Sequence, residues 1–277
     1  MTDIKGRTAF ITGGANGIGL GIARSLANEG AKLALVDLDA AALERAKAEL
    51  QSITQVETYI LDVRDRAAYA ATGEAVERDL GPVTLLFNNA GVAGYDSVRR
   101  LTYELWDWYI NINLYGVING LMTFMPKMLE RGQGGHIVNT ASGAGLVASG
   151  AGILYTTSKY AVVGMSEELR INSEIKAAGI GVSVLCPNRV ATGIVKRTLD
   201  ATPQTAKVPL PEAYEKVIAE ALESAQTALL NEGVPIDVVG EMVLKAVKEN
   251  KPYIITDRAA EDLIKNRFKA QLEALPD

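Results

Sequence analysis

The chain is poor in the side chains on which several classes of enzyme depend. It has one cysteine, Cys186, and one histidine, His136, among 277 residues. An intrachain disulfide is therefore excluded, and neither a thiolate nor a histidine-rich zinc site can be assembled. A Ser-His-Asp hydrolase would need His136, and no Gly-x-Ser-x-Gly motif occurs in a strand-turn-helix context. We expect no metal site, a core position for Cys186 and a structural role for His136.

Long apolar runs and an excess of positive charge are also lacking. No segment approaches the ~20 consecutive apolar residues that span a bilayer, and the N-terminal residues have no signal-peptide character. The net charge of −5 gives no electrostatic footprint for nucleic acid. We therefore expect a cytoplasmic protein with no nucleic-acid partner and no membrane contact.

What the sequence does contain is 48% apolar residues and an alternation of strand and helix patterns without a linker. One domain over 1–277 is therefore more plausible than two. The alternation predicts an α/β fold, in which a doubly wound parallel sheet carries helices on both faces.

A glycine-rich turn follows the first predicted strand, which covers 8–12. Its spacing is Gly-x-x-x-Gly-x-Gly, with Gly13, Gly17 and Gly19, and a helical pattern begins at Ile18. Such a turn lets the backbone approach a pyrophosphate while the amide end of the helix faces the anion. Tight packing of strand against helix would select the same glycines, so the motif depends on its context.

That context includes an acidic residue after the second predicted strand, 32–36. Asp37 lies about twenty residues beyond the central glycine, where dinucleotide-binding folds place a ribose ligand. A carboxylate there accepts hydrogen bonds from ribose hydroxyls and repels a 2′-phosphate. Leu38 follows instead of arginine, and neither Ala15 nor Asn16 supplies a cation, so NAD is predicted over NADP. The alternative is that Asp37 only caps the next helix.

Tyr155 and Lys159 would share one face of a helix predicted over 154–178, because they are four residues apart. A nearby ammonium group favours the phenolate, and with a second positive charge it could bring the pKa of Tyr155 down from ~10 towards working pH. Tyr155 could then serve as general acid or base. Ser142, which ends an apolar run, could hold a substrate oxygen. The same spacing is common on ordinary helices, so the pair counts only together with the other motifs.

Taken together, these residues resemble the short-chain dehydrogenase/reductase family, from about Lys5 to Thr192. The resemblance implies a Rossmann-type fold and a catalytic tetrad of Asn113, Ser142, Tyr155 and Lys159. The implied cofactor-binding residues are Gly13, Asn16, Gly17, Ile18, Gly19, Asp37, Leu38, Asp62, Val63, Asn89, Ala90, Gly91, Tyr155, Lys159, Pro187, Val190 and Thr192.

The resemblance also implies a mechanism. Tyr155 exchanges a proton with the substrate oxygen while hydride moves to or from the nicotinamide, and Ser142 orients that oxygen. Lys159 holds the cofactor ribose and lowers the pKa of Tyr155, and Asn113 supports a water beside Lys159.

One position departs from the family pattern. Pro187 is followed by Asn188, where the family usually has glycine. Asparagine tolerates left-handed backbone angles better than most residues, so the turn could be kept. The side chains of Asn188 and Arg189 could reach the substrate and change the shape of the pocket.

The substrate is indicated by less distinctive segments. Residues 193–235 are predicted to cover the pocket as a proline-containing loop followed by a helix over 211–230, although a helix packed on the core would show the same periodicity. The segments 92–95 and 143–148 are small or apolar. They suit a bulky, uncharged secondary alcohol or ketone, unless they pack internally.

Within the family, residues 101–138 and the segment 251–256 with the final helix are similar to lignin-derived aryl-ether Cα-dehydrogenases. This similarity implies NAD-dependent oxidation of a benzylic or other hydrophobic secondary alcohol. A hydroxysteroid dehydrogenase, a 3-oxoacyl reductase and a non-enzymatic NAD-sensing regulator are the alternatives. The family resemblance also implies a homodimer or homotetramer formed through the helices near 104–131 and 154–178.

Overall fold

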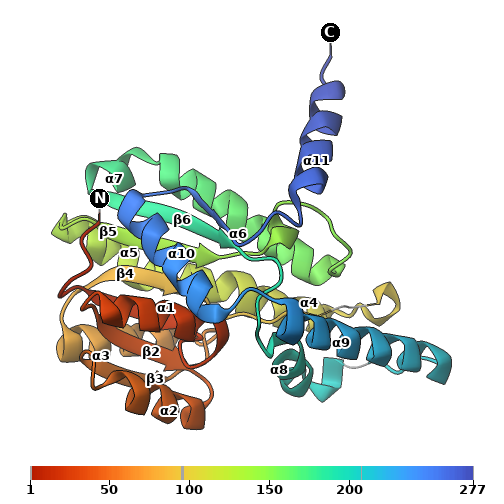
Figure 1. Cartoon of the computed structure of the whole chain (residues 1–277), viewed down its shortest axis with the longest axis horizontal. Helices are drawn as coiled ribbons and strands as arrows, with labels where there is room; N and C mark the ends of the chain where they lie inside the picture. The colour runs from red at the N-terminus through yellow and green to blue at the C-terminus, as the bar shows by residue number, and fades with distance from the viewer. Residues whose placement is uncertain (1, 95–96, 207, 277) are drawn as a thin grey trace.

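A single parallel sheet organises the computed structural model, which describes residues 2–94, 97–206 and 208–276. Within these residues the sheet has the strand order β3-β2-β1-β4-β5-β6-β7 (Figure 1). All six pairs of neighbouring strands are parallel, which confirms the predicted doubly wound α/β fold. The strands are β1 (Thr8–Thr12), β2 (Lys32–Asp37), β3 (Val56–Ile60), β4 (Val83–Asn88), β5 (Gly135–Thr140), β6 (Ile180–Cys186) and β7 (Tyr253–Ile255).

Helices cover both faces of the sheet (Figure 1). One face packs against α1 (Gly17–Asn28), α2 (Ala40–Leu50) and α10 (Ile236–Glu249). The other packs against α3 (Arg66–Leu80), α5 (Gly116–Arg131) and α6 (Ile153–Ile171). Because both faces are covered, β1, β4, β5 and β6 are buried along their whole length, which explains their continuous apolar runs.

The position of α1 is fixed by an unusually close contact with α10. A Cβ atom added at Gly21 would lie 2.1 Å from the carbonyl oxygen of Ile236, and one added at Gly240 would lie 2.1 Å from that of Gly21. Only glycine allows the two backbones to approach this closely. The start of α1, which carries the glycine-rich turn, is therefore held against a rigid neighbour.

Of the two long helices predicted around the site, one is broken, and the other is continuous but contains a π-helical turn. The prediction of one helix over 154–178 is wrong, because Asn172 adopts an extended conformation between α6 and α7 (Ser173–Ala177). Its side chain accepts hydrogen bonds from the amides of Glu174 and Ile175, at 2.9 and 3.2 Å, and so starts a new helix. Upstream, α4 (Tyr103–Ile110) joins α5 through a π-helical turn over Asn111–Tyr115.

The segment 193–235 contains more helix than predicted. Its first part is not a loop, because α8 (Ile194–Ala201) begins directly after Gly193 and buries Val195 and Thr198. Pro203 follows α8 and stops it. The second helix, α9 (Glu212–Glu232), agrees with the prediction over 211–230.

The C-terminal helix α11 (Glu261–Glu273) projects away from the body of the molecule (Figure 1). None of its residues is buried. Over the described parts of the chain, none of the helices has both the length and the apolar character that crossing a membrane requires.

The two residues that the sequence analysis assigned to structural roles lie in the sheet. Cys186 is buried at the end of β6. His136 is fully buried in β5, where Nε2 lies 2.8 Å from Oγ of Ser183, which in turn donates to the carbonyl oxygen of Lys251. Since that hydroxyl hydrogen is engaged, the imidazole acts as the donor through Nε2. Burial lowers the pKa of His136 to about 3.

We therefore expect His136 to stay neutral in the folded protein at pH values where an exposed histidine is charged. Because the unfolded chain binds this proton near pH ~6.5 and the folded chain does not, His136 should reduce the free energy of unfolding by up to ~1.4 kcal/mol for each pH unit below that point. The only imidazole signal in the NMR spectrum should not titrate between about pH 7.5 and 5, whereas it should in urea. A midpoint near 6.5 in the folded protein would contradict this assignment.

Candidate active site

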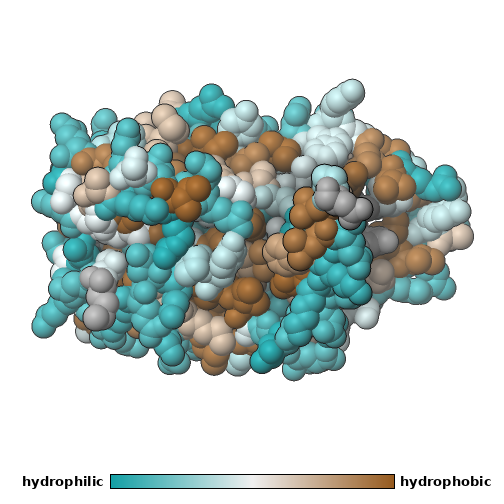
Figure 2. All heavy atoms as spheres, turned by 90° about the horizontal axis from the view of Figure 1, so that it is seen from above, coloured by the Kyte–Doolittle hydropathy of each residue, from teal (hydrophilic) through white to brown (hydrophobic). Residues whose placement is uncertain are grey.

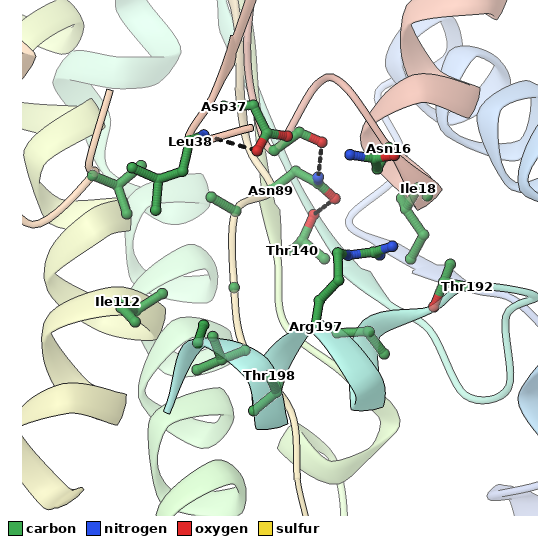
Figure 3. A pocket seen from close by; sticks show the side chains of 18 of the residues that line it. Asn16, Ile18, Asp37, Leu38, Asn89, Ile112, Thr140, Thr192, Arg197 and Thr198 are labelled. Atoms are coloured by element: carbon green, nitrogen blue, oxygen red, sulfur yellow. Dashed lines mark hydrogen bonds between the residues drawn. The ribbon is translucent and has the colours of Figure 1, made fainter. Parts of the chain in front are cut away.

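A cavity of about 570 Å³ lies beside the carboxyl ends of the central strands. The strand order reverses here, since β1 lies between β2 and β4, and open α/β sheets bind ligands at such a point. Figure 3 shows side chains from distant segments pointing into the same space. The predicted site residues that line it are Gly13, Asn16, Gly17, Ile18, Asp37, Leu38, Asp62, Val63, Asn89, Ala90, Gly91, Tyr155, Lys159, Pro187 and Thr192.

Four predicted site residues lie behind the cavity wall. Gly19 packs against the glycine-rich turn, Asn113 and Ser142 are buried, and Val190 forms an isolated bridge with Val234. Their geometry supports the wall, and any direct role for them stays a prediction.

The glycine-rich turn packs tightly and also opens onto the cavity. Gly13 and Gly17 adopt left-handed angles, with φ of 62° and 50°, and both line the cavity. A Cβ atom at Gly19 would lie 2.0 Å from the carbonyl oxygen of Gly13, so this glycine is required for packing. Asn16, Gly17 and Ile18 line the cavity, so the amide end of α1 faces it, and Asn16 makes no side-chain cap hydrogen bond there.

Asn89 ties together the ends of three strands. Its Nδ2 donates to the carbonyl oxygen of Thr12 at 3.1 Å. Its Oδ1 accepts from Oγ1 of Thr140 at 3.3 Å (Figure 3). The hydroxyl of Thr12 accepts hydrogen bonds from the amides of Asn89 and Ala90, at 2.9 and 3.0 Å. These bonds fix the floor of the cavity where β1, β4 and β5 end.

The carboxylate of Asp37 stands at the end of β2 and is half-buried. It accepts hydrogen bonds from the amides of Leu38, Asp39 and Ala15, at 2.8, 3.2 and 3.3 Å. The residue that caps α2 is instead Asp39, whose side chain accepts from the amide of Ala42 at 2.9 Å. The alternative that Asp37 serves as the helix cap is therefore wrong.

Tyr155 and Lys159 lie side by side on α6, as their spacing predicted. The ammonium nitrogen of Lys159 is 5.7 Å from the centre of the Tyr155 ring, and it donates a hydrogen bond of 3.0 Å to the carbonyl oxygen of Thr140. Only 4% of Lys159 is exposed, and burial lowers the pKa of its side chain to about 8.

The electrostatics of Tyr155 differ from the expectation. Burial raises the pKa of its phenol, and hydrogen bonding from Ser142 opposes this shift without cancelling it. Desolvation of the phenolate therefore outweighs its stabilisation by the Ser142 hydroxyl. The raised pKa keeps Tyr155 a protonated phenol at neutral pH.

The hydroxyl of Ser142 lies next to this pair at the start of a short 3₁₀ turn, Gly143–Gly145. It donates to the carbonyl oxygen of Pro187 at 3.4 Å and accepts from the amide of Ala144 at 3.2 Å. Because the bond to Pro187 is long, the hydroxyl hydrogen of Ser142 is readily available to another acceptor.

Asn113 lies in the π-helical turn between α4 and α5 and is fully buried. Its Nδ2 donates to the carbonyl oxygen of Val92 and to Oγ of Ser158, at 3.0 and 3.1 Å, and its Oδ1 accepts from the amide of Val92 at 2.9 Å. These bonds tie the chain after β4 to α6. The water that Asn113 was expected to support stays a prediction.

The expectation that Asn188 and Arg189 reach the substrate is wrong. Nδ2 of Asn188 donates to Oδ1 of Asp257 at 2.8 Å, and its Oδ1 lies 2.0 Å from where a Cβ atom at Gly143 would stand. Its backbone is not left-handed. Arg189 pairs with Glu232 at 2.7 Å on the surface. Both side chains are thus drawn away from the cavity by partners far along the chain.

Part of the cavity wall was not predicted from the sequence. Trp108 and Ile112 line it from the segment before α5, and α8 contributes Ile194, Arg197, Thr198, Asp200 and Ala201. A helix start after Gly193 was the signal that could have revealed α8. Of the apolar segments, Val92 lines the cavity, residues 143–145 are buried internally, and Tyr95 lies outside the described residues.

Comparisons with known proteins agree with this geometry. The family model described as short chain dehydrogenase matches residues 7–202. The chain is 32% identical to C alpha-dehydrogenase from Sphingobium sp. (strain NBRC 103272 / SYK-6), over 99% of this chain and 88% of that protein.

Two solved structures extend the comparison. A short chain dehydrogenase/reductase from Burkholderia phymatum, in complex with NAD, is 31% identical, with a TM-score of 0.91 and coverage of 100% of this chain and 98% of the other. LigO from Sphingobium sp. strain SYK-6 is 35% identical, with a TM-score of 0.79 and coverage of 99% and 90%.

Proposed function

The chain belongs to the short-chain dehydrogenase family of oxidoreductases, and we propose that it interconverts a hydrophobic secondary alcohol, aryl alcohols foremost, and its ketone with NAD. One observation carries the proposal. One cavity is lined both by the glycine-rich turn with Asp37 and by Tyr155 with Lys159. A proton-transferring side chain and a dinucleotide-binding turn are thus within one continuous space.

The residues present fit a nicotinamide dinucleotide. Gly13 and Gly17 present backbone without side chains, and the amide end of α1 is suited to a pyrophosphate. Asp37 stands where ribose hydroxyls would be bound. These features support the assignment of the cofactor-binding residues.

The charges at the adenosine end support NAD rather than NADP. Asp37 would repel a 2′-phosphate, and the cation in that part of the cavity, Arg64, is engaged by Asp62 through bonds of 2.6 and 3.0 Å. The guanidinium group of Arg64 holds the pKa of the Asp62 carboxyl below its usual value. The Burkholderia relative is described in complex with NAD.

The bound nicotinamide would supply hydride transfer, which no side chain of this protein can perform. The protein has to move the proton. In ketone reduction the protonated phenol of Tyr155 can donate to the forming alkoxide, and its raised pKa keeps that proton in place. In alcohol oxidation Tyr155 has to accept a proton, which requires Lys159 as ammonium together with a second positive charge.

Apolar side chains line the part of the cavity near Tyr155. They are Val92, Trp108 and Ile112, and Ile194 of α8 also lines the cavity. This lining suits a bulky uncharged substrate and agrees with the name of the C alpha-dehydrogenase relative. A steroid or a 3-oxoacyl chain would meet the same lining, so these substrates are the alternatives to test. A regulator that only senses NAD would not need Tyr155 and Lys159 in the cavity.

The segment 193–235 is proposed to cover the substrate end. Helix α8 lines the cavity, and α9 holds α8 through Gln226, whose Nε2 donates to the carbonyl oxygen of Thr192 at 2.9 Å and whose Oε1 accepts from the amide of Lys196 at 3.1 Å. The cover is therefore a pair of helices rather than a loop.

A homodimer or homotetramer and a cytoplasmic location complete the proposal. The helices expected to form the interfaces expose Tyr103, Met122 and Ile171 by 86, 65 and 62%. Figure 2 shows apolar patches interleaved with hydrophilic ones on the face from which α11 projects. Helix α11 buries none of its residues, although it exposes Phe268 and Leu272. Burial against a second copy would account for these surfaces.

The acid/base role is tested by Tyr155→Phe, which removes one hydroxyl and keeps the ring. We expect turnover of aryl secondary alcohols, followed by NADH absorbance, to fall by about 10²–10⁴-fold, with NAD affinity nearly unchanged. Tyr160→Phe on the same helix is the matched control and should retain activity. Retained activity in the Tyr155 variant would remove the assignment. Tight NAD binding with no turnover of any alcohol or ketone by the wild type would favour a sensor.

The cofactor preference is tested by Asp37→Asn, which keeps the size of the side chain and removes its charge. Two like charges about 4 Å apart repel by roughly 1–4 kcal/mol, so the ratio of kcat/KM for NADP to that for NAD should rise about tenfold or more. Asp65→Asn, at the cap of α3 and outside the cavity, is the control and should leave the ratio unchanged. Equal efficiency of the wild type with both cofactors would contradict the preference.

A further inference from the structure

Among the described residues, three cationic side chains line the cavity, and one of them has no partner. Arg64 is paired with Asp62, and Lys159 donates to the carbonyl oxygen of Thr140. The guanidinium group of Arg197 makes no hydrogen bond or ion pair with any described residue. The nearest acidic residue on the same helix, Asp200, is paired with Lys196.

Arg197 is directed at the beginning of α1. Figure 3 shows its side chain extending from α8 toward Asn16 and Ile18. Its Nη2 is 3.6 Å from where a Cβ atom at Gly17 would stand, and its Nη1 is 3.0 Å from the equivalent point at Gly193. The guanidinium group therefore lies close to the glycine-rich turn, and both line the cavity.

The Arg197 guanidinium group and the amide end of α1 are both positive and lie close to each other. The amide end of α1 carries the positive pole of the helix dipole, and a cation near it is unfavourable. No acidic residue lies in the first turn of α1, and Asn16 does not cap it through its side chain. The arrangement becomes favourable when an anion lies between the amides and Arg197.

The helix that carries Arg197 is held in place independently of that anion. On one side, the amide of Ala93 donates to Oγ1 of Thr198 at 2.9 Å. On the other, Gln226 of α9 bonds the backbone of Thr192 and Lys196. The backbone of Arg197 is thus positioned before any ligand binds.

We propose that Arg197 binds the pyrophosphate of the dinucleotide together with the glycine-rich turn. This inference rests on the proposed function, because it requires a dinucleotide in the cavity. A guanidinium group can donate two parallel hydrogen bonds to phosphate oxygens, which a neutral side chain cannot replace. Since α8 also supplies Ile194 and Thr198 to the wall, the same contact links the cofactor to the cover of the substrate end.

The test compares a ligand that has the pyrophosphate with one that lacks it. Dissociation constants of ADP-ribose and adenosine are measured for the wild type and for Arg197→Gln, by calorimetry and by competition. We expect about tenfold weaker binding of ADP-ribose and unchanged binding of adenosine. Arg197→Lys should be intermediate, because it keeps the charge and loses the paired donors. Lys196→Gln, an exposed neighbour on the same helix, removes one positive charge and should change neither constant.

Three results would overturn the proposal. The first is unchanged binding of ADP-ribose by Arg197→Gln, and the second is an equal loss of affinity for ADP-ribose and adenosine. The third is a change confined to the KM of the alcohol at saturating NAD, which would assign Arg197 to substrate binding. Thermal unfolding of each variant shows whether the fold is kept, and Arg197→Lys decides the question if the glutamine variant does not fold. A wild type that binds neither NAD nor ADP-ribose would instead contradict the proposed function itself.

Discussion

A buried ammonium group beside a tyrosine ring is the interaction on which the site depends. Removing a charge from water costs several kcal/mol, and among the described residues Lys159 has one hydrogen-bond acceptor, the carbonyl oxygen of Thr140. Burial accordingly lowers the pKa of Lys159 to about 8. The folded protein thus keeps a buried cation with too few hydrogen-bond acceptors, and further acceptors would stabilise its charge. Ribose hydroxyls and the phenolate of Tyr155 are the acceptors that the proposed reaction would bring to it.

Separate parts of the chain are held in position around this cation by the rest of the architecture. The Asn89 hydrogen bonds join the ends of β1, β4 and β5, and the contact between α1 and α10 fixes the glycine-rich turn. Helix α8 closes the opposite side and carries an unpaired guanidinium group. With Arg197 on the pyrophosphate, the cofactor would be held between two elements that belong to different ends of the sequence.

Much of the site could be predicted because its motifs have strict local geometry. Gly13 and Gly17 need left-handed backbone angles, and Tyr155 and Lys159 meet because they are four apart on a helix. The parallel sheet with helices on both faces followed from the alternation of apolar runs and amphipathic helices. What could not be predicted depends on distant partners. Asn188 turns toward Asp257, 69 residues away, and the raised pKa of Tyr155 arises from burial, which no local spacing reports.

The missed elements have similar causes. Helix α8 is short and lies among threonine, lysine and proline residues, so its pattern resembles a loop. The break at Asn172 is a side-chain cap inside a segment whose periodicity continues across it. Nothing in the sequence marked Arg197, because its proposed role depends on the position of its side chain close to the start of α1.

The central claim, that positive charge converts the buried phenol of Tyr155 into a base, is tested most directly by its ionisation. The protein has 10 tyrosines, and NMR of ¹³Cζ-labelled tyrosine resolves their signals individually. The Tyr155 signal is the one that is missing from the spectrum of Tyr155→Phe. Without NAD⁺, Tyr155 should ionise above the ordinary value of ~10, and with saturating NAD⁺ at a clearly lower pH, because the nicotinamide charge adds to that of Lys159. A Tyr155 signal that titrates at the same pH in both conditions would contradict the account.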